Sequence, residues 1–187
     1  MKLHPQSLIN SVQRTPNFIG SLFEETETAK TVKKICERDP SFSQEKFLKE
    51  SRDFIIPEVL EALLARDLST LHSWCSEGLF NMLKAKFDAE KGEKILESKI
   101  LDLRHVELVS AKLLDDHPVM VLSFNAQHLL VVEAEEDGVK SNEKNEVLCE
   151  DRIENLYHVW ALVKDVEEEN PITGGWKVME MATRNVW

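Results

Sequence analysis

The sequence has few of the residues that interrupt regular structure, with only six prolines and six glycines in 187 residues. Because 42% of the residues are hydrophobic, a mostly disordered chain is excluded. No apolar run approaches the ~20 residues that a membrane-spanning helix needs. The first residues show neither the apolar core of a secretion signal nor an arginine-rich, acid-free transit peptide. We therefore expect one folded domain with an extension, either cytosolic or separated from its leader.

The three cysteines, Cys36, Cys75 and Cys149, are widely spaced and form no CxxC pair. An odd, scattered set gives no disulfide framework and indicates a reducing compartment. The sequence also lacks a glycine-rich phosphate loop, a GxSxG motif, an HExxH motif and Cys/His residues at zinc spacing. We therefore predict no catalytic residue, no metal and no cofactor.

Titratable residues that could act together are sparse in the second half of the chain. Asp102 and His105 are three apart, so a regular strand would place them on opposite faces. His105 and Glu107 would share a face and could pair, although such a lone pair is more often a surface contact than an acid–base couple. His128 and His158 fall within predicted strands, and the sequence shows no catalytic partner for either.

The net charge of −11 is unevenly distributed. Residues 1–66 carry ten basic and ten acidic side chains, so the net negative charge lies entirely after them. This acidic part would repel phosphates, which disfavours nucleic acid as a partner. It suits a basic ligand, or it serves only to keep the chain in solution.

Helical periodicity dominates the first half of the chain. Residues 1–38 are predicted to be a helical extension, and residues 39–187 are predicted to form the domain. Ser41 and Gln44 stand at capping-box spacing before the first helix of that domain. Apolar spacing then predicts helices over residues 43–56, 57–65, 68–78 and 79–92. The first two are expected to meet at a kink at Pro57, since proline removes a backbone hydrogen bond and crowds the preceding turn.

After Gly92 the hydrophobic pattern changes to a period of two, as in Met120, Leu122 and Phe124. We predict about four long strands joined by hairpin-length loops. The fold class is therefore α+β, with the N-terminal helices packed on one face of a curved antiparallel sheet. A curled sheet of this kind would leave an apolar hollow on its concave side. The candidates to line it, which could also be ordinary core residues, are Phe87, Phe124, Trp160 and Trp176.

Several long blocks of sequence carry a family resemblance, in order, along nearly the whole chain. They are LFEETETAK, DPSFSQEKFLKESRDFIIPEVLEALLARD, ILDLRHVELVSAKLL, VWALVKD and NPITGGWKVMEM. The chain resembles the C-terminal domain of the Tim44 family, peripheral subunits of the mitochondrial inner-membrane presequence translocase. The resemblance implies an NTF2-like cone, in which helices and a curved sheet surround a large apolar pocket. It also implies that the N-terminal half of such proteins lies outside this chain.

The resemblance implies an import adaptor and not an enzyme. Family members hold the matrix heat-shock chaperone of the seventy-kilodalton class at the outlet of the import channel, on the matrix side of the inner membrane. The expected partners are that chaperone, the channel subunits, incoming preproteins with their presequences, and the anionic lipid cardiolipin. Presequences are basic and amphipathic, which suits an acidic body with an apolar hollow.

The first helices of the domain, from Phe42 to Ala65, are the part that the resemblance implicates in lipid contact. Apolar side chains can enter the membrane interface while basic ones meet anionic headgroups. Each of the three cations would contribute about 1 kcal/mol of binding free energy at an anionic membrane, so docking to the membrane would be weak and reversible. The alternative is that this face packs on the sheet of its own domain. The predicted membrane-binding residues are Phe42, Lys46, Phe47, Lys49, Arg52, Phe54 and Ile55.

Two other functions fit the sequence. One is a protein of the same domain family that tethers the mitochondrial ribosome to the membrane, against which the acidic body argues mildly. The other is a small-molecule isomerase, since a cone fold can host an apolar pocket with a carboxylate base. An isomerase requires an Asp or Glu inside the hollow.

Overall fold

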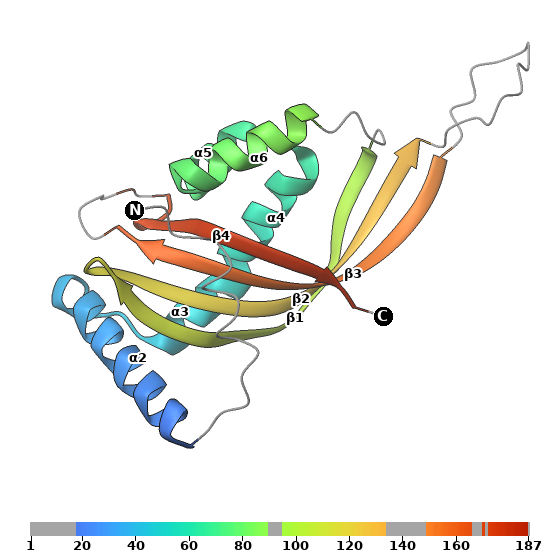
Figure 1. The fold of residues 1–187 in the computed structure, drawn as a ribbon. Helices are drawn as coiled ribbons and strands as arrows, with labels where there is room; N and C mark the ends of the chain where they lie inside the picture. The colour runs from blue at the N-terminus through green and yellow to red at the C-terminus, as the bar shows by residue number, and fades with distance from the viewer. Residues whose placement is uncertain (1–17, 90–94, 134–148, 166–169, 171, 187) are drawn as a thin grey trace, which may run out of the picture.

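The structure, a computed structural model, describes residues 18–89, 95–133, 149–165, 170 and 172–186, with side chains from residue 27 onward. Residues 1–17 of the predicted extension lie outside this part. The helical segments are α2 (Phe18–Arg38), α3 (Gln44–Glu50), η1 (Ser51–Ile55), α4 (Ile56–Ala65), α5 (Leu68–Trp74) and α6 (Glu77–Ala89). The strands are β1 (Ile95–Leu114), β2 (His117–Glu133), β3 (Cys149–Lys164) and β4 (Trp176–Asn185). Helices therefore come first in the chain and strands second (Figure 1).

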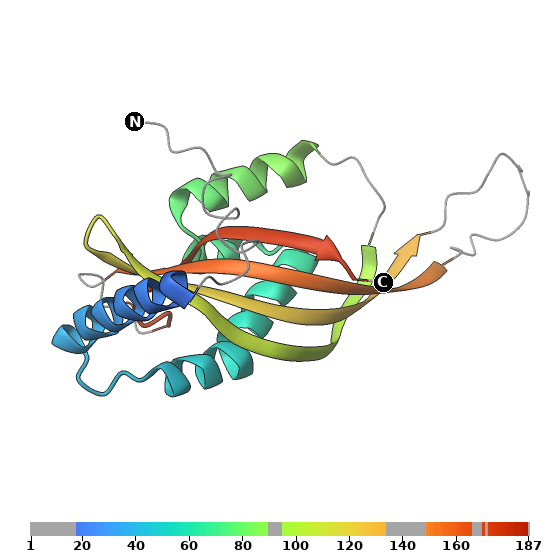
Figure 2. The same cartoon turned by 60° about the horizontal axis from the view of Figure 1, so that its bottom comes forward.

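The four strands form one antiparallel sheet in the order β1-β2-β3-β4, which confirms the predicted α+β fold. The pairing of β2 with β3 is regular along its whole length, from Val119 opposite Val163 to Glu133 opposite Cys149. β1 instead shifts its register against β2 at four places. Such bulges bend and twist a strand, and the sheet curves around α3, η1 and α4, which cross one of its faces (Figures 1 and 2).

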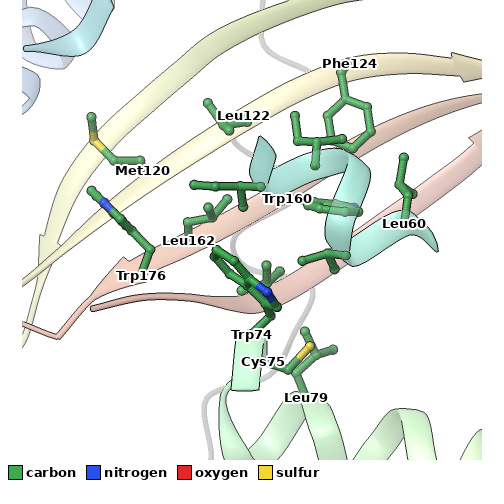
Figure 3. Close-up of a cluster of buried hydrophobic side chains, with 14 of the residues drawn as sticks. Leu60, Trp74, Cys75, Leu79, Met120, Leu122, Phe124, Trp160, Leu162 and Trp176 are labelled. Atoms are coloured by element: carbon green, nitrogen blue, oxygen red, sulfur yellow. The ribbon is translucent and has the colours of Figure 1, made fainter. Parts of the chain in front are cut away.

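The core lies between these helices and the concave face of the sheet, and Figure 3 shows part of it. On the sheet side, Leu122 pairs with Trp160, and Leu162 pairs with Val178, so large side chains stand in register across three strands. All four have exposed fractions of 0%. Each fully buried side chain of this size contributes about 1.5–3 kcal/mol to folding by leaving water. The helices complete the core with Ile56, Val59, Leu60, Leu71, Trp74 and Leu79.

The first helix of the domain begins at a different cap from the one predicted. Ser43, not Ser41, is the N-cap of α3, and its Oγ accepts from the backbone N–H of Lys46 at 3.1 Å. Ser41 instead donates its hydroxyl to Asp39 Oδ1 at 2.7 Å. Asp39 and Ser41 thus close the turn before the helix, and Ser43 satisfies one of the free N–H groups at the helix start.

A π-helical turn, η1, joins α3 to α4 directly before Pro57, where a kink was predicted. The backbone stays right-handed helical across Glu50, Ser51 and Ile56, and the Ile56 N–H donates to the carbonyl of Ser51, five residues back. Pro57 then occupies the first turn of α4, where its missing N–H costs little. The wider turn accommodates one extra residue, and the helix continues through Pro57 without interruption.

α2 packs on the sheet beside the β1–β2 hairpin (Figure 1). Thr31 and Ile35 are buried, with exposed fractions of 0% and 1%. Lys34 Nζ lies 2.6 Å from Asp116 Oδ2 in the hairpin turn, and this hydrogen bond raises the pKa of the lysine. In the described part of the chain, no helix is both long enough and apolar enough to cross a membrane.

Candidate functional site

The helix formed by α3, η1 and α4 presents the three predicted cations to solvent. Lys46, Lys49 and Arg52 are all exposed. Arg52 Nε donates to Asp53 Oδ1 at 2.9 Å, and this hydrogen bond lowers the pKa of the Asp53 carboxyl. Because both side chains are about half exposed, the pair adds little stability. Glu45 and Glu50 are exposed among these cations as well, so with Asp53 the surface carries three acidic and three basic side chains.

Two of the predicted lipid-contacting residues face the opposite way. Phe47 and Ile55 have exposed fractions of 2% and 1% and belong to the core. The Phe47 ring lies 4.6 Å from the Trp176 ring on β4, measured between centroids. These two side chains hold the helix on the sheet, and in this structure they cannot contact lipid. Phe47 and Ile55 therefore pack on the sheet of their own domain, which was the alternative to lipid contact.

The π turn explains why the predicted apolar face divides. Phe47 and Phe54 are seven residues apart, about two turns of a regular α-helix, so a regular helix would place them on one face. The wider turn over Ser51–Ile55 instead aligns Phe47, Ser51 and Ile55, all buried, along the sheet. Phe54 moves out of this line and is 47% exposed.

The two remaining aromatic residues of the predicted set lie at opposite ends of this helix surface. Phe54 is supported by Trp74 of α5, whose ring centroid lies 5.9 Å away in an edge-on geometry. Phe42 is half-buried and lies 6.1 Å from Phe47 and 6.3 Å from Trp176 between ring centroids. The residues that can face a partner are therefore Phe42, Lys46, Lys49, Arg52 and Phe54, which we call the exposed helix set.

The aromatic residues predicted to line a hollow are found in or beside the core. Phe124 and Trp160 are fully buried, with ring centroids 4.9 Å apart in a T-shaped arrangement (Figure 3). Trp176 is 4% exposed, and Lys164 Nζ lies 5.2 Å from the centroid of its ring. Phe87 of α6 is half-buried beneath the Arg66 guanidinium. All four stabilise the packing of helices on the sheet, and their role in lining a ligand pocket stays a prediction.

Two histidines lie together at one end of this aromatic group. His128 and His158 have exposed fractions of 3% and 4%, and their ring centroids are 5.9 Å apart. His158 stacks on Phe124 at 4.8 Å, and its Nδ1 lies 3.0 Å from Thr183 Oγ1. Burial lowers the pKa of His158 to about 4 and also lowers the pKa of His128. Both imidazoles are therefore neutral at physiological pH.

The polar side chains buried in the core bear on the isomerase alternative. Among the described residues, the buried polar side chains are hydroxyls and these two imidazoles, and none is an aspartate or a glutamate. The Cys75 thiol is also buried, which raises its pKa to about 12 and leaves it protonated. In the same part of the chain, no group of three or more His, Cys, Asp and Glu side chains is arranged to hold a metal ion.

A hollow of about 390 Å³ is lined by residues of β1, β2 and β3 and by Val186. The amides of Asn125, Gln127 and Asn155 line it, and Gln127 Nε2 donates to Asn155 Oδ1 at 2.9 Å. Asp102 and His105 also line it. The sequence prediction that these two residues face opposite ways is therefore wrong.

The reason is a bulge in β1 that regular alternation does not foresee. The register against β2 shifts between Arg104 and Glu107. His105 has a backbone φ of +53°, a value that residues other than glycine rarely adopt. The bulge directs His105 towards Asn125, whose Nδ2 lies 3.2 Å from His105 Nδ1. The His105 imidazole therefore contacts the amide of Asn125, and not the Glu107 carboxylate that the sequence offered as its partner.

Comparison with known proteins identifies relatives over nearly the whole chain. The sequence pattern of the Tim44-like domain family matches residues 28–183. Among curated proteins, the chain is 31% identical over 170 residues to the mitochondrial import inner membrane translocase subunit TIM44 of Homo sapiens. It is 34% identical over 179 residues to the subunit of the same name in Saccharomyces cerevisiae, and 30% identical over 180 residues to subunit TIM44-1 of Arabidopsis thaliana.

The matches cover the chain far more fully than they cover the relatives. They include 90%, 92% and 94% of this chain but only 36%, 40% and 36% of the human, yeast and plant proteins. The chain thus corresponds to little more than a third of each relative's length.

Proposed function

Because this chain belongs to the Tim44-like domain family, we propose that it acts in protein import at the mitochondrial inner membrane, as a peripheral subunit of the translocase on the matrix side. One observation carries this proposal: the family pattern spans residues 28–183, and relatives named as import translocase subunits are 30–34% identical over about nine-tenths of the chain. In this function the chain links the import channel to the matrix heat-shock chaperone of the seventy-kilodalton class and contacts incoming preproteins.

The exposed helix set supports contact with anionic lipid. Its two lysines, its arginine and the half-exposed Phe54 lie on one helix whose opposite side is fixed to the sheet. Each cation near an anionic headgroup contributes about 1 kcal/mol of binding free energy. An aromatic ring can enter the membrane interface beside these cations. Since neighbouring acidic residues offset part of this charge, docking to cardiolipin should be weak and reversible.

Liposome flotation tests lipid docking with a matched pair of charge reversals. The test variant is Lys46→Glu, Lys49→Glu and Arg52→Glu. The control is Lys33→Glu, Lys84→Glu and Lys99→Glu, which changes the net charge equally at exposed positions on α2, α6 and β1.

We expect wild type and the control to float with cardiolipin-containing vesicles and not with neutral ones. The test variant should lose about a hundredfold in affinity, since three contacts of about 1 kcal/mol are removed. Equal flotation of the two variants would show that the exposed helix set is not the lipid-binding surface.

Association with the translocase is a separate part of the proposal. Tagged chain recovered from mitochondria should bring down the import channel and the matrix chaperone. Recovery of ribosomal proteins in their place would favour the membrane-tethering function at the mitochondrial ribosome.

A further inference from the structure

The hollow lined by β1, β2 and β3 contains a group of side-chain amides. Asn125 and Gln127 of β2 flank Ala126, which is buried in the core, so the two amides stand on the other face of the sheet. Asn155 of β3 lies directly opposite Gln127 in the strand register. Three carboxamides therefore meet in one hollow, on one face of two neighbouring strands.

The backbone and the residue types at this place do not favour a regular sheet. Strands are depleted in asparagine, which lacks the β-branched or aromatic shape that packs against cross-strand neighbours, yet Asn125 and Asn155 both lie within strands. His105, which also lines the hollow, has a φ of +53° at the bulge in β1. Bulges and strained residues of this kind cluster at binding sites, where the function offsets their cost in stability.

Contacts between neighbouring side chains hold these amides in place. Gln127 Nε2 donates to Asn155 Oδ1 at 2.9 Å, and Asn125 Nδ2 lies 3.2 Å from His105 Nδ1. Among the described residues, Gln127 Oε1, Asn155 Nδ2 and Asn125 Oδ1 have no hydrogen-bond partner. The hollow therefore presents two acceptors and one donor group, in positions set by the sheet, to a ligand.

The charges in the hollow indicate that this ligand is neutral. Among the described residues that line it, Asp102 and Arg104 carry opposite charges and form an ion pair with each other. An ionic ligand would have to compete with this pair. A carboxamide instead offers the same donor and acceptor groups as a peptide bond. The main chain of a polypeptide carries these groups at every residue except proline, so it matches the amides of the hollow.

The size of the hollow limits the length of polypeptide that it can hold. Its volume of about 390 Å³ is near the lower end of the range of about 300–1,000 Å³ for ligand sites. Neighbouring strands lie about 4.8 Å apart, so the side chains on β1, β2 and β3 span about 10 Å. An extended chain covers that distance in about three residues. Leu156 and Val186 also line the hollow and offer apolar contact to a small side chain.

We infer that this hollow binds the main chain of an extended polypeptide over about three residues, through hydrogen bonds from the amides of Asn125, Gln127 and Asn155. Recognition of the main chain does not depend on the sequence of the polypeptide. The inference deepens the proposed function, and it rests on that function only for its natural partner, an incoming preprotein.

The probe is acetyl-trialanine amide, a neutral peptide. Its matched control, acetyl-trisarcosine amide, has the same atomic composition, but its three backbone nitrogens are methylated and cannot donate. NMR follows the side-chain amide signals of Asn125, Gln127 and Asn155 in the wild-type chain as each peptide is added. The alanine peptide should shift these signals with a dissociation constant of about 1 mM. The sarcosine peptide should bind about tenfold more weakly, since the two acceptors of the hollow lose their donors.

Equal affinity for the two peptides would overturn the inference, because hydrogen bonds to the main chain would then not explain binding. Signals that neither peptide shifts would also overturn it. Maltotriose is added in a parallel titration, because sugar hydroxyls both donate and accept as well. Shifts with maltotriose and none with the alanine peptide would assign the hollow to a carbohydrate and refute a peptide site.

A pair of variants separates binding from folding. Gln127→Thr combined with Asn155→Thr removes two carboxamides and puts a cross-strand pair of threonines in their place, which suits a sheet. The control, Asn81→Ala, removes an exposed amide on α6. The double variant should bind the alanine peptide about tenfold more weakly than wild type and unfold at no lower urea concentration. The control should bind the peptide as wild type does.

A double variant with wild-type affinity would show that these amides are not the site. Unfolding of the double variant at a lower urea concentration would also count against the inference, because the amides would then serve the fold. The purified chain is sufficient for all these measurements. Their failure would leave the import function standing, and absence of the chain from the translocase would leave the peptide site standing.

Discussion

At the scale of single residues, His128 and His158 differ from the other described histidines in lying within the core. Among the described residues, the Nε2 atom of each has no hydrogen-bond partner, and neither has the indole Nε1 of Trp160 beside them. A buried polar group without a partner loses its hydration, so each costs stability. For an imidazole the cost rises sharply on protonation, because a charge would then be buried.

This burial predicts acid sensitivity. The pKa of His158 is about 4 in the folded chain, below its ordinary value of 6.5. Between these two values the unfolded chain takes up a proton that the folded chain does not, so the free energy of unfolding falls as pH falls from about 6.5 towards 4. The total effect is on the order of a few kcal/mol.

Urea unfolding at several pH values between 7.5 and 4 measures this slope. His158→Phe should flatten it, since phenylalanine can keep the stacking on Phe124 and does not titrate. His117→Gln, at the exposed first residue of β2, is the control and should keep the wild-type slope. A slope unaffected by His158→Phe would mean that another group controls the acid response.

At the scale of elements, the helix over residues 44–65 has two faces with different tasks. One face, with Phe47 and Ile55, is fixed to the sheet, and the other carries the exposed helix set. The division follows from the π turn, which keeps the buried residues in line and turns Phe54 outward. The helix can therefore meet a partner without leaving its own domain.

Alanine substitutions on the two faces should separate stability from binding. Phe47→Ala should lower the free energy of unfolding by about 3–5 kcal/mol, because a fully buried aromatic ring is replaced by a cavity. Phe54→Ala removes a ring that is 47% exposed and should cost about 1 kcal/mol or less. Equal losses in a urea titration would contradict this assignment of faces.

At the scale of the whole molecule, charge is separated along the chain. The first 66 residues are electrically balanced, and the remainder carries the net charge of −11. The exposed helix set belongs to the balanced part, and the strands of the sheet belong to the acidic part. Anionic lipid and basic polypeptide would therefore meet different regions of one domain, each attracted by the opposite charge.

This separation predicts that binding of a basic, amphipathic presequence peptide weakens with salt. Raising ionic strength from about 0.1 to 1 M shortens the screening distance from about 10 to 3 Å, so we expect at least about a tenfold loss of affinity. Chemical-shift mapping would follow the peptide, with a version in which glutamine replaces its basic residues as control. Shifts that are the same at both salt concentrations would argue against an electrostatic site.

The sequence alone was sufficient for much of the fold. Alternation in β2 and β3 predicts which side chains are buried, as for Leu122, Phe124 and Trp160. Regular patterns fail where the backbone departs from them. The bulge at His105 and the π turn each shift one residue out of phase, and a period of two or of 3.6 carries no signal of such a shift.

The site residues were only partly predictable for a related reason. An apolar residue on an amphipathic helix suits both lipid and core, so the sequence could not distinguish Phe47 from Phe54. That decision depends on the sheet at the other side of the helix, to which Trp176, more than a hundred residues later, contributes.

The π turn also gives this helix a place where its length can change. A regular helix turns about 100° per residue, so deleting one residue from α3 or α4 would rotate everything beyond the deletion away from the sheet. Deleting one residue from Ser51–Ile55 would instead convert the wide turn into an ordinary one and leave both flanks in phase. Homologues one residue shorter here could keep the same architecture, and an alignment gap at this point would record a change in hydrogen bonding and not a change in fold.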